Sequence, residues 1–414
     1  MISSKEINLE KEIVHYIDWL SNFGKNKSGG ITRLLYTDEW KKAQDGLKNL
    51  MEEMGFDTYF DRVGNLFGRL EGSLYKDETI LTGSHIDTVV NGGRYDGQFG
   101  IIGGILALKY LKGNYGQPLR NIEVVSIAEE EGSRFPFAFW GSKNIIGLAK
   151  REMVENLRDV NGLSFVDEMQ RLGFDFNQPD YEGRKDLKAF IELHIEQGGV
   201  LEKEQKSIGI VHHIVGQRRF TIEVRGESNH AGTTPMGYRK DALYGASQMI
   251  KSIIDKAYEY GDPLVATVGS IELEPNTVNV VPGRVVFTLD TRHICKEALE
   301  EFTQDVERII EEISTKMGLI TRVEKWMDCD PIAMDEELVE FIKNRCEKEG
   351  ISYKLMHSGA GHDSQKFANE IPTAMIFVPS HNGISHSPEE YTEPKDLVEG
   401  VRVLIETLYY LAYQ

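Results

Sequence analysis

The 414-residue sequence predicts an α/β protein, in which a layered domain with a largely parallel sheet is interrupted by a smaller α+β unit. Two observations support this, and the length itself is too great for one ordinary domain. In the first half, almost wholly apolar strand patterns alternate with helical patterns, whereas after Gly216 the strands alternate between apolar and polar residues. Apolar strands are typical of a parallel sheet covered on both faces, and alternating strands leave one face in water.

The first half of the chain reads as helices and buried strands in turn. The segment MISSKEINLEKEIVHYIDWL predicts an amphipathic helix, and a second helix is expected over 38–53. Strands are expected over 79–82, 122–128 and 189–194. The small apolar run GIIGGILALKYLK, between the first two strands, predicts a helix packed closely on the sheet. Ligands of such sheets bind beyond the carboxyl ends of the strands.

After Gly216 the pattern is that of a half-exposed sheet with two helices. The expected elements are a strand over 218–225, a helix over 239–260, strands over 264–272 and 284–292, a helix over 296–317 and a strand over 319–323. This β-α-β-β-α-β order is that of a ferredoxin-like unit.

The last part of the chain returns to the style of the first. TAMIFVPS is another apolar strand, and a closing helix follows it. We therefore predict a discontinuous main domain, residues 1–213 and 331–414, and an inserted domain, residues 214–330. The two crossings between them would make a hinge.

The bulk composition excludes several classes of function. A net charge of −19 argues against nucleic acid or an anionic membrane surface as the partner. The N-terminus lacks the features of a signal peptide, and no stretch approaches the roughly 18 apolar residues of a membrane span. Cys295, Cys329 and Cys346 are too scattered for a disulfide framework or a zinc knuckle. We expect reduced thiols and a cytoplasmic protein.

Metal-binding types of side chain stand at the ends of the apolar runs. They are His85 and Asp87 in GSHIDTV, Asp96 in GGRYDGQFG, Glu129, Glu130 and Glu131 in AEEEGSRF, His194 in ELHIEQGG and His386 in GISHSPEE. Acidic and imidazole groups gathered in a dry cleft repel one another or lose their charge unless a cation lies among them. The set predicts a hydrolase built around two metal ions.

The spacing suggests how the work is divided. His85 and Asp87 lie two apart on a strand and face the same side, so the carboxylate could orient a metal-bound imidazole. Asp96 could bridge two cations, although an Asp-Gly turn alone more often serves chain reversal. Of the acidic run, Glu129 is expected in a solvated loop, while Glu130 and Glu131 divide proton transfer and metal binding. Each residue alone is more often structural, and their joint occurrence carries the prediction.

A longer series of motifs resembles a known family. GSHIDTV, GGRYDGQFG, EEEGSRF, HIEQG, SNHAGTTPM, NVVPG, DTRH, SGAGHD and ISHSPEE occur in the order found in the hydantoinase- and carbamoylase-associated amidohydrolases. These belong to the dinuclear metallopeptidase and aminoacylase superfamily, and the resemblance covers nearly the whole chain. It implies a metallopeptidase-like catalytic domain with a layered α/β sheet and an inserted ferredoxin-like lid and dimerisation domain.

The resemblance also assigns roles at the metal centre. It implies that His85 and His194 hold one metal ion, that Glu131 and His386 hold the other, and that Asp96 bridges both. Glu130 would be the general base and acid, and Asp87 would orient His85. Members of the family typically use zinc or manganese, and this donor set fits Zn²⁺, Mn²⁺ or Co²⁺ without choosing among them.

Further contacts are implied for both domains. In the inserted domain, His230 would stabilise the oxyanion, and Asn279 and Arg292 would bind a substrate carboxylate. His230 and Asn279 are expected to act in the site of the partner subunit of a homodimer. Without the resemblance, His230 reads as a loop histidine and Arg292 as a surface strand end.

In the main domain the implied substrate contacts are Gln197, Gly361 and His362. One residue departs from the family: Ser364 follows Gly-His-Asp where an alanine is usual, and its hydroxyl is not expected to disturb metal binding.

The implied reaction is metal-dependent hydrolysis of a ureido (N-carbamoyl) C–N bond in a small carboxylate substrate. The stretch SRFPFAFWGSKNIIG favours the members that convert allantoate to ureidoglycine, ammonia and carbon dioxide in purine catabolism. Hydrolysis of N-carbamoyl-L-amino acids or β-ureidopropionate is the alternative, because it uses the same catalytic motifs. A non-catalytic, metal-dependent ligand binder is the alternative from another class, and the intact Glu130 argues against it.

Overall fold

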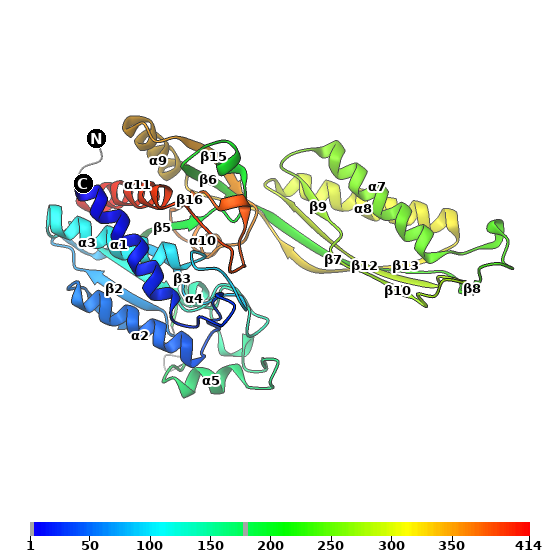
Figure 1. Cartoon of the computed structure of the whole chain (residues 1–414), viewed down its shortest axis with the longest axis horizontal. Coiled ribbons are helices and arrows are strands. Elements are labelled where there is room, and N and C mark those ends of the chain that lie inside the picture. Colours follow the sequence, from blue (N-terminus) through cyan, green and yellow to red (C-terminus); the bar gives the residue numbers. More distant parts are fainter. Residues whose placement is uncertain (1–3, 177–180) are drawn as a thin grey trace. The chain divides into compact units, whose positions relative to one another are not determined.

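The computed structural model describes residues 4–176 and 181–414 (Figure 1). Contacts divide the chain into two compact units, one formed by Met1–His212 with Ala333–Gln414 and the other by His213–Ile332. Within the described residues, every helix is too short or too polar to cross a membrane. The lid and dimerisation roles of the second unit stay a prediction.

The first unit is built on one mixed sheet. In sheet order its described strands are β1 (Asp57–Phe60), β2 (Leu66–Leu70), β4 (Arg120–Ile127), β3 (Tyr75–His85), β5 (Leu187–Ile195), β16 (Thr373–Val378), β6 (Ile208–Ile214) and β14 (Ile332–Ala333), with β15 (Tyr353–Ser358) paired to β6. β4, β3, β5 and β16 run parallel, and nearly all residues of β4, β5 and β16 are buried. The predicted parallel core of apolar strands is confirmed.

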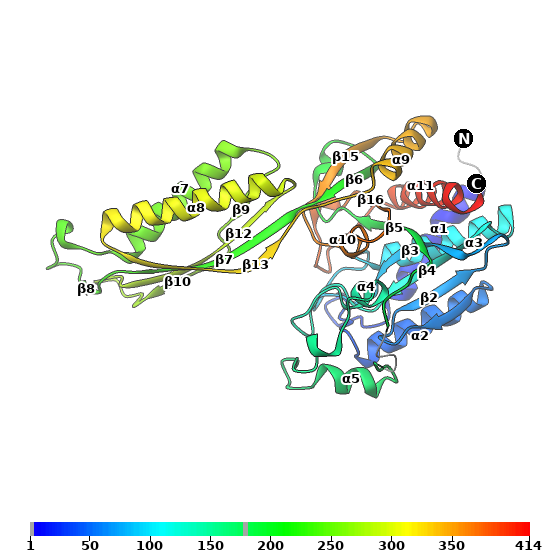
Figure 2. The same cartoon turned by 180° about the vertical axis from the view of Figure 1, so that it is seen from behind.

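Helices cover both faces of this sheet. Successive strand residues point to opposite faces and therefore enter different hydrophobic cores. Ile80 and Ile122 join a core with α1 (Ser4–Ser21), α2 (Asp38–Glu53), α3 (Gln98–Tyr115), α9 (Glu336–Glu349) and α11 (Pro394–Tyr413). Leu81 and Val125 enter a second core with residues of α4 (Trp140–Ile145) and α10 (Ser364–Phe367). Figure 2 shows these two helices from behind. The short helices α5 (Phe165–Arg171) and α6 (Val200–Lys203) complete the unit.

Local chemistry explains two of the helices. The Thr37 hydroxyl accepts the N–H of Trp40 at 3.3 Å and starts α2 at the predicted residue, Asp38. The small residues of α3 allow close packing on the sheet, as the sequence predicts. A Cβ at Gly100 would lie 2.3 Å from the carbonyl oxygen of Leu193 in β5.

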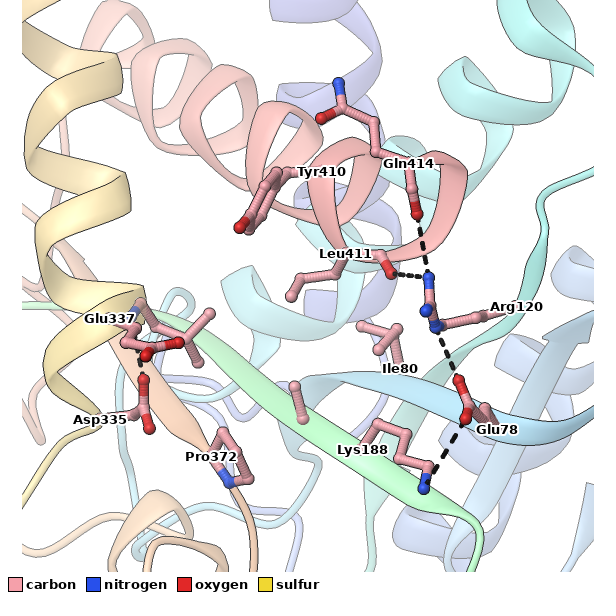
Figure 3. Close-up of a pocket in the computed structure, with 12 residues that line it drawn as sticks. Glu78, Ile80, Arg120, Lys188, Asp335, Glu337, Pro372, Tyr410, Leu411 and Gln414 are labelled. Carbon is pink, nitrogen blue, oxygen red and sulfur yellow. Dashed lines mark hydrogen bonds and ion pairs between the residues drawn. The ribbon is translucent and has the colours of Figure 1, made fainter. Parts of the chain in front are cut away.

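A pocket of about 460 Å³ lies at the starts of the parallel strands (Figure 3). Several of the charged side chains at its edge form ion pairs with one another. Arg120 donates to Glu78 at 2.7 Å and to the carbonyl oxygen of Gln414 at 3.0 Å, and so closes the end of α11. The predicted metal ligands stand instead at or beyond the carboxyl ends of these strands.

The second unit has the predicted ferredoxin-like order. Its described sheet runs β10 (Ile271–Glu274), β12 (Arg284–His293), β7 (Gly216–Arg225) and β13 (Ile320–Cys329), with β9 (Val265–Thr267) paired to β12. The helices α7 (Ala242–Tyr260) and α8 (Lys296–Met317) pack on one face, where they share a core with the inward residues of β7 and β12. The fold class predicted from the sequence is confirmed.

Three of its boundaries differ from the prediction. The helix expected from residue 239 begins at Ala242, because the Asp241 carboxylate accepts the N–H of Tyr244 at 3.0 Å and caps the helix there. The strand expected over 264–272 is two strands, β9 and β10, separated by residues 268–270. The last strand does not end at residue 323 but continues to Cys329, along its pairing with β7.

Candidate metal centre and active site

Two histidines stand together at the ends of neighbouring parallel strands. His85 ends β3 and His194 lies near the end of β5, both buried, with ring centroids 5.8 Å apart. The Nδ1 of His85 faces the Asp87 carbonyl oxygen at 3.0 Å, and the Nδ1 of His194 faces the Ile195 carbonyl oxygen at 2.9 Å. A carbonyl can only accept, so each ring places its proton on Nδ1 and its lone pair on Nε2.

Both Nε2 atoms lie near one carboxylate oxygen, and that of His194 also accepts the N–H of Gly97 at 3.3 Å. Asp96 Oδ1 lies 3.5 Å from Nε2 of His85 and 3.2 Å from Nε2 of His194. Its other oxygen, Oδ2, lies 3.1 Å from Nε2 of His386. Atoms that only accept repel at this distance unless a proton or a cation lies between them. Burial opposes a charged ring, but Asp96 outweighs it and raises the pKa of His194 above its usual value.

The donor atoms form two groups that share Asp96. One contains His85, Asp96 and His194, and the other contains Asp96, Glu131 and His386, with all donor atoms of a group within 4.8 Å of one another. Each oxygen of Asp96 serves a different group, which is the geometry of a carboxylate between two cations. The structure therefore brings together all five predicted ligands, and the donors fit two divalent ions.

Asp87 supports both the histidine and the acidic run. Its Oδ1 lies 3.3 Å from Nδ1 of His85 and accepts the N–H of Glu130 at 2.9 Å, while its Oδ2 accepts the N–H of Glu131 at 3.2 Å. Glu130 itself lies with His85 and Glu131 in a third donor group. One buried carboxylate thus orients the imidazole of His85, a predicted metal ligand, and fixes the backbone of Glu130 and Glu131.

The expectation that Glu129 lies in a solvated loop is wrong. This side chain is 2% exposed, and its carboxylate accepts the N–H of Trp140 at 3.1 Å and also that of Gly132. Glu129 holds the start of α4 against the end of β4, which is a structural task.

Burial shapes the electrostatics of the acidic run. It raises the pKa of Glu130 well above that of an exposed glutamate, since desolvation disfavours the charged form. It also raises the pKa of Glu131 to about 7, with help from the nearby Asp96. The hydrogen bond to Asp96 raises the pKa of His386 to about 9.

Metal affinity should therefore rise with pH. A metal ion must displace the protons of His386 and Glu131, which in the metal-free protein are lost only near pH 9 and pH 7. Although burial opposes it, hydrogen bonds to Asp87 and Asp96 also raise the pKa of His85 well above its usual value. We therefore expect apparent affinity to rise at least about tenfold per pH unit between pH 7 and 9, and more steeply below pH 7. Chelator-buffered Mn²⁺ titrations at pH 6, 7 and 8 test this, and a flat affinity over that range would contradict it.

Three predicted substrate contacts lie around these ligands. Gln197 has a positive φ of 57°, and its side-chain Nε2 donates to Asp96 Oδ2 at 3.0 Å. The buried ring of His362 packs edge-on against His194, with centroids 4.6 Å apart. A Cβ at its neighbour Gly361 would lie 3.2 Å from the ring of Phe139.

The other three predicted residues lie in the second unit, at two separate places. His230 in β8 (Asn229–His230) pairs with β11 (Val280–Val281), and the N–H of Ala231 donates to the Asn279 carbonyl oxygen at 2.9 Å. Arg292 lies at the far end of β12, where Asp290 binds its guanidinium at 2.9 and 3.1 Å. The structure brings His230 and Asn279 together, but it separates them from Arg292 by most of the length of β12.

Glu192, which the sequence motifs did not single out, is fully buried near His194. It accepts hydrogen bonds from the Ser84 hydroxyl at 2.8 Å and from the Ser364 N–H and hydroxyl at 3.0 and 2.6 Å. It also forms a donor group with His194 and His362. The unusual hydroxyl of Ser364 thus has a definite partner. The signal was its position two residues before His194 on one strand.

Comparison with known proteins agrees with this centre. A family model described as "Peptidase family M20/M25/M40" matches residues 81–410. The protein named "Allantoate amidohydrolase" from Escherichia coli (strain K12) is 53% identical over 98% of this chain and 99% of its own length. The protein of the same name from Bacillus subtilis (strain 168) is 45% identical over the whole of both chains. "N-carbamoyl-L-amino-acid amidohydrolase" from Pseudomonas sp. (strain NS671) is 36% identical over 98% of this chain and 99% of its own length.

Solved structures give the same result. The amidase of the hydantoinase/carbamoylase family from Burkholderia multivorans superposes with a TM-score of 0.93 at 35% identity, over 98% of both chains. The resemblance read from the sequence motifs is confirmed, and the family uses divalent metal ions, which the described donor groups suit. The chain belongs to peptidase family M20/M25/M40 and, within it, to the hydantoinase- and carbamoylase-type amidohydrolases.

Proposed function

We propose that this protein hydrolyses allantoate, a carboxylate whose central carbon bears two ureido groups. The observation that carries the proposal is the Asp96 carboxylate, whose two oxygens face two groups of metal-type donors beside the buried Glu130. The 53% identity to a protein named for this reaction supports the choice of substrate. Water adds to one ureido carbonyl, and one of the two C–N bonds of that carbonyl carbon breaks. The resulting carbamate decomposes, and the final products are ureidoglycine, ammonia and carbon dioxide.

His85 and His194 would hold one divalent ion, Glu131 and His386 would hold the other, and Asp96 would bridge them. When bound, such ions lower the pKa of a water molecule and polarise the carbonyl group. Zn²⁺, Mn²⁺ and Co²⁺ all suit three imidazoles and two carboxylates.

The chain's own residues move the proton. Glu130 accepts the proton of the attacking water and returns it to the leaving nitrogen, a task that suits a buried carboxyl group with a raised pKa. Asp87 holds the backbone N–H of Glu130 at 2.9 Å, so the base keeps its place while its charge changes. His230 would donate a hydrogen bond to the developing oxyanion, which is worth about 3–4 kcal/mol for one good donor.

Arg292 would bind the substrate carboxylate, with Gln197, Gly361 and His362 as further contacts. A planar guanidinium grips a carboxylate with two parallel bonds, which an ammonium cannot copy. Asp290 fixes one edge of this guanidinium at 2.9 and 3.1 Å and so sets its plane.

We expect Arg292→Lys to raise KM about 10- to 100-fold with unchanged metal content, since charge-assisted bonds are worth about 1.5–3 kcal/mol. Arg284→Lys is the matched control, because Arg284 starts the same strand and pairs with Glu274 at 2.7 Å. Steady-state kinetics on allantoate provide the measurement. Equal KM values for both variants and the wild type would remove Arg292 from the substrate site.

Two copies of the chain would form a homodimer and complete each site together. Within the second unit, His230 and Asn279 lie near the Arg284 end of β12 and Arg292 lies at the other end. Eight residues of strand span about 27 Å. A small ureido carboxylate cannot reach both places, so Arg292 and the pair His230 and Asn279 would bind different substrate molecules.

Mixed subunits test this arrangement. His230→Ala and Glu130→Ala proteins, each inactive alone, should recover up to about a quarter of wild-type activity after random subunit exchange, because half of the dimers are then mixed and each has one intact site. Exchange is verified with two affinity tags. Exchanged but inactive mixtures would contradict action in the partner's site.

The proposed function is tested by ammonia release from the Mn²⁺-supplemented protein with allantoate and a panel of N-carbamoyl-L-amino acids. Fast turnover of allantoate alone is expected. Faster turnover of the N-carbamoyl-L-amino acids would agree with the proposed metal-dependent mechanism but would show that allantoate is not the preferred substrate. Two bound metal ions with no turnover of any substrate would indicate a ligand binder.

A further inference from the structure

Glu390 is a buried carboxylate that takes no part in the proposed catalytic steps. It is 2% exposed and ends the segment that begins with Ser385 and His386. Its Oε1 accepts the backbone N–H of Tyr95 at 2.8 Å and that of Asp96 at 3.1 Å. Its Oε2 accepts the hydroxyl of Ser385 at 2.8 Å.

These bonds connect two loops that are far apart in the sequence. The first follows β3 and carries Asp96, and the second follows β16 and carries His386. Glu390 belongs to the second loop, and it reaches the first across 294 residues. The first loop folds tightly over the carboxylate, since a Cβ at Gly93 would lie only 2.1 Å from Glu390 Oε1. A side chain at Gly93 would displace this contact.

We propose that Glu390 is a positioning residue that holds the bridging Asp96 and the ligand His386 at the separation needed for two metal ions. The inference rests on the proposed metal roles of those two residues. Glu390 itself is in none of the donor groups found among the described residues, and hydrogen bonds occupy both its oxygens.

The backbone of the second loop needs such a restraint. His386 has a positive φ of 55°, a conformation that side chains rarely adopt and that surrounding contacts must maintain. The residue before it, Ser385, is fixed by Glu390 on one side and by Gln197 Nε2 at 3.3 Å on the other. The side chain of His386 is 48% exposed, so close packing restrains only part of it.

The hydrogen bonds to the two oxygens of Glu390 should have different effects on metal binding, and this can be tested. The Oε1 bonds act on Asp96, which both donor groups share, whereas the Oε2 bond acts only on the loop of His386. Ser385→Ala should therefore weaken the binding of only one metal ion, the ion held by Glu131 and His386. Glu390→Gln keeps the shape but removes the charge and places an amide where one carboxylate oxygen stood, so it should weaken both.

The experiment measures Mn²⁺ stoichiometry and the two dissociation constants by chelator competition on the full chain. Residues that orient metal ligands typically contribute 10- to 100-fold in affinity. We expect Glu390→Gln to weaken both ions within that range, and Ser385→Ala to weaken one ion about tenfold. Glu389→Gln, an exposed neighbour with the same change, should bind like the wild type.

Thermal unfolding of the metal-free proteins separates positioning from stability. A loss of affinity in Ser385→Ala with an unchanged metal-free melting temperature supports the inference. Wild-type affinities in both variants would overturn it, as would a lower melting temperature without a loss of affinity. A wild-type protein that binds fewer than two ions would instead overturn the metal centre on which the proposed function depends.

Discussion

Glu130→Gln is expected to lower kcat on allantoate about 10²- to 10⁴-fold, the usual contribution of a general acid–base. The amide has the shape of the carboxylate but cannot take the proton of the attacking water. Metal content should stay at two ions, because the five residues of the two Asp96 groups do not include Glu130. The N–H of Glu130 still reaches Asp87, so the loop should keep its conformation.

The measurement combines single-turnover kinetics with metal analysis of the same sample. Glu129→Gln is an instructive comparison, because Glu129 is an adjacent glutamate whose carboxylate caps α4 and does not face the donor groups. That variant should have a lower free energy of unfolding, while its kcat stays close to that of the wild type. Full activity in Glu130→Gln would assign the proton to another group and would remove the central step of the mechanism.

Asp96→Ala is expected to abolish activity and to weaken both metal ions by more than about 100-fold, beyond the effect of residues that only orient ligands. Both donor groups lose a member at once, since each oxygen of Asp96 faces a different group. His386→Ala is the informative partner, because it removes a member of one group only.

Isothermal titration with Mn²⁺ and Zn²⁺ separates the two cases. Asp96→Ala should show no tight site, and His386→Ala should retain one. If Asp96→Ala kept one ion at wild-type affinity, the carboxylate would not be shared, and the centre would consist of two independent sites.

The architecture could be predicted because it depends on local patterns. The bounds of α2 and α8 agree with the sequence, since Asp38 and Lys296 follow clear changes in polarity. The side chains that gather near Asp96 could be picked out from the sequence because most of them follow an apolar strand or stand in a glycine-rich turn, while their role as metal ligands stays a prediction. The strand predicted over 264–272 was wrong because the break at residues 268–270 looks like ordinary strand alternation.

Other parts of the site depend on contacts that no local pattern reveals. The sequence predicts a solvated loop for Glu129, and only its contacts with the N–H groups of Trp140 and Gly132 show that this side chain is buried and structural. Glu390 stands in the motif ISHSPEE, whose sequence predicts a role for His386 but none for Glu390, since the partners of Glu390 lie almost 300 residues away. Asp290 is the exception: it lies two residues before Arg292 on one strand, so spacing alone could have indicated it.

The sheet order β5–β16–β6 has a consequence for synthesis on the ribosome. β16 lies between β5 and β6, yet it is made about 160 residues after β6 ends. At about 5–20 residues per second the emerging chain waits roughly 8–30 s before this gap can close. During that time β5 lacks one neighbour, and until β14 and β15 are made the apolar β6 lacks all three of its partners, β14, β15 and β16, which invites pairing with other chains. The second unit, whose strands are all made within this interval, can meanwhile fold. Chaperone demand should therefore fall when Thr373–Val378 leaves the exit tunnel.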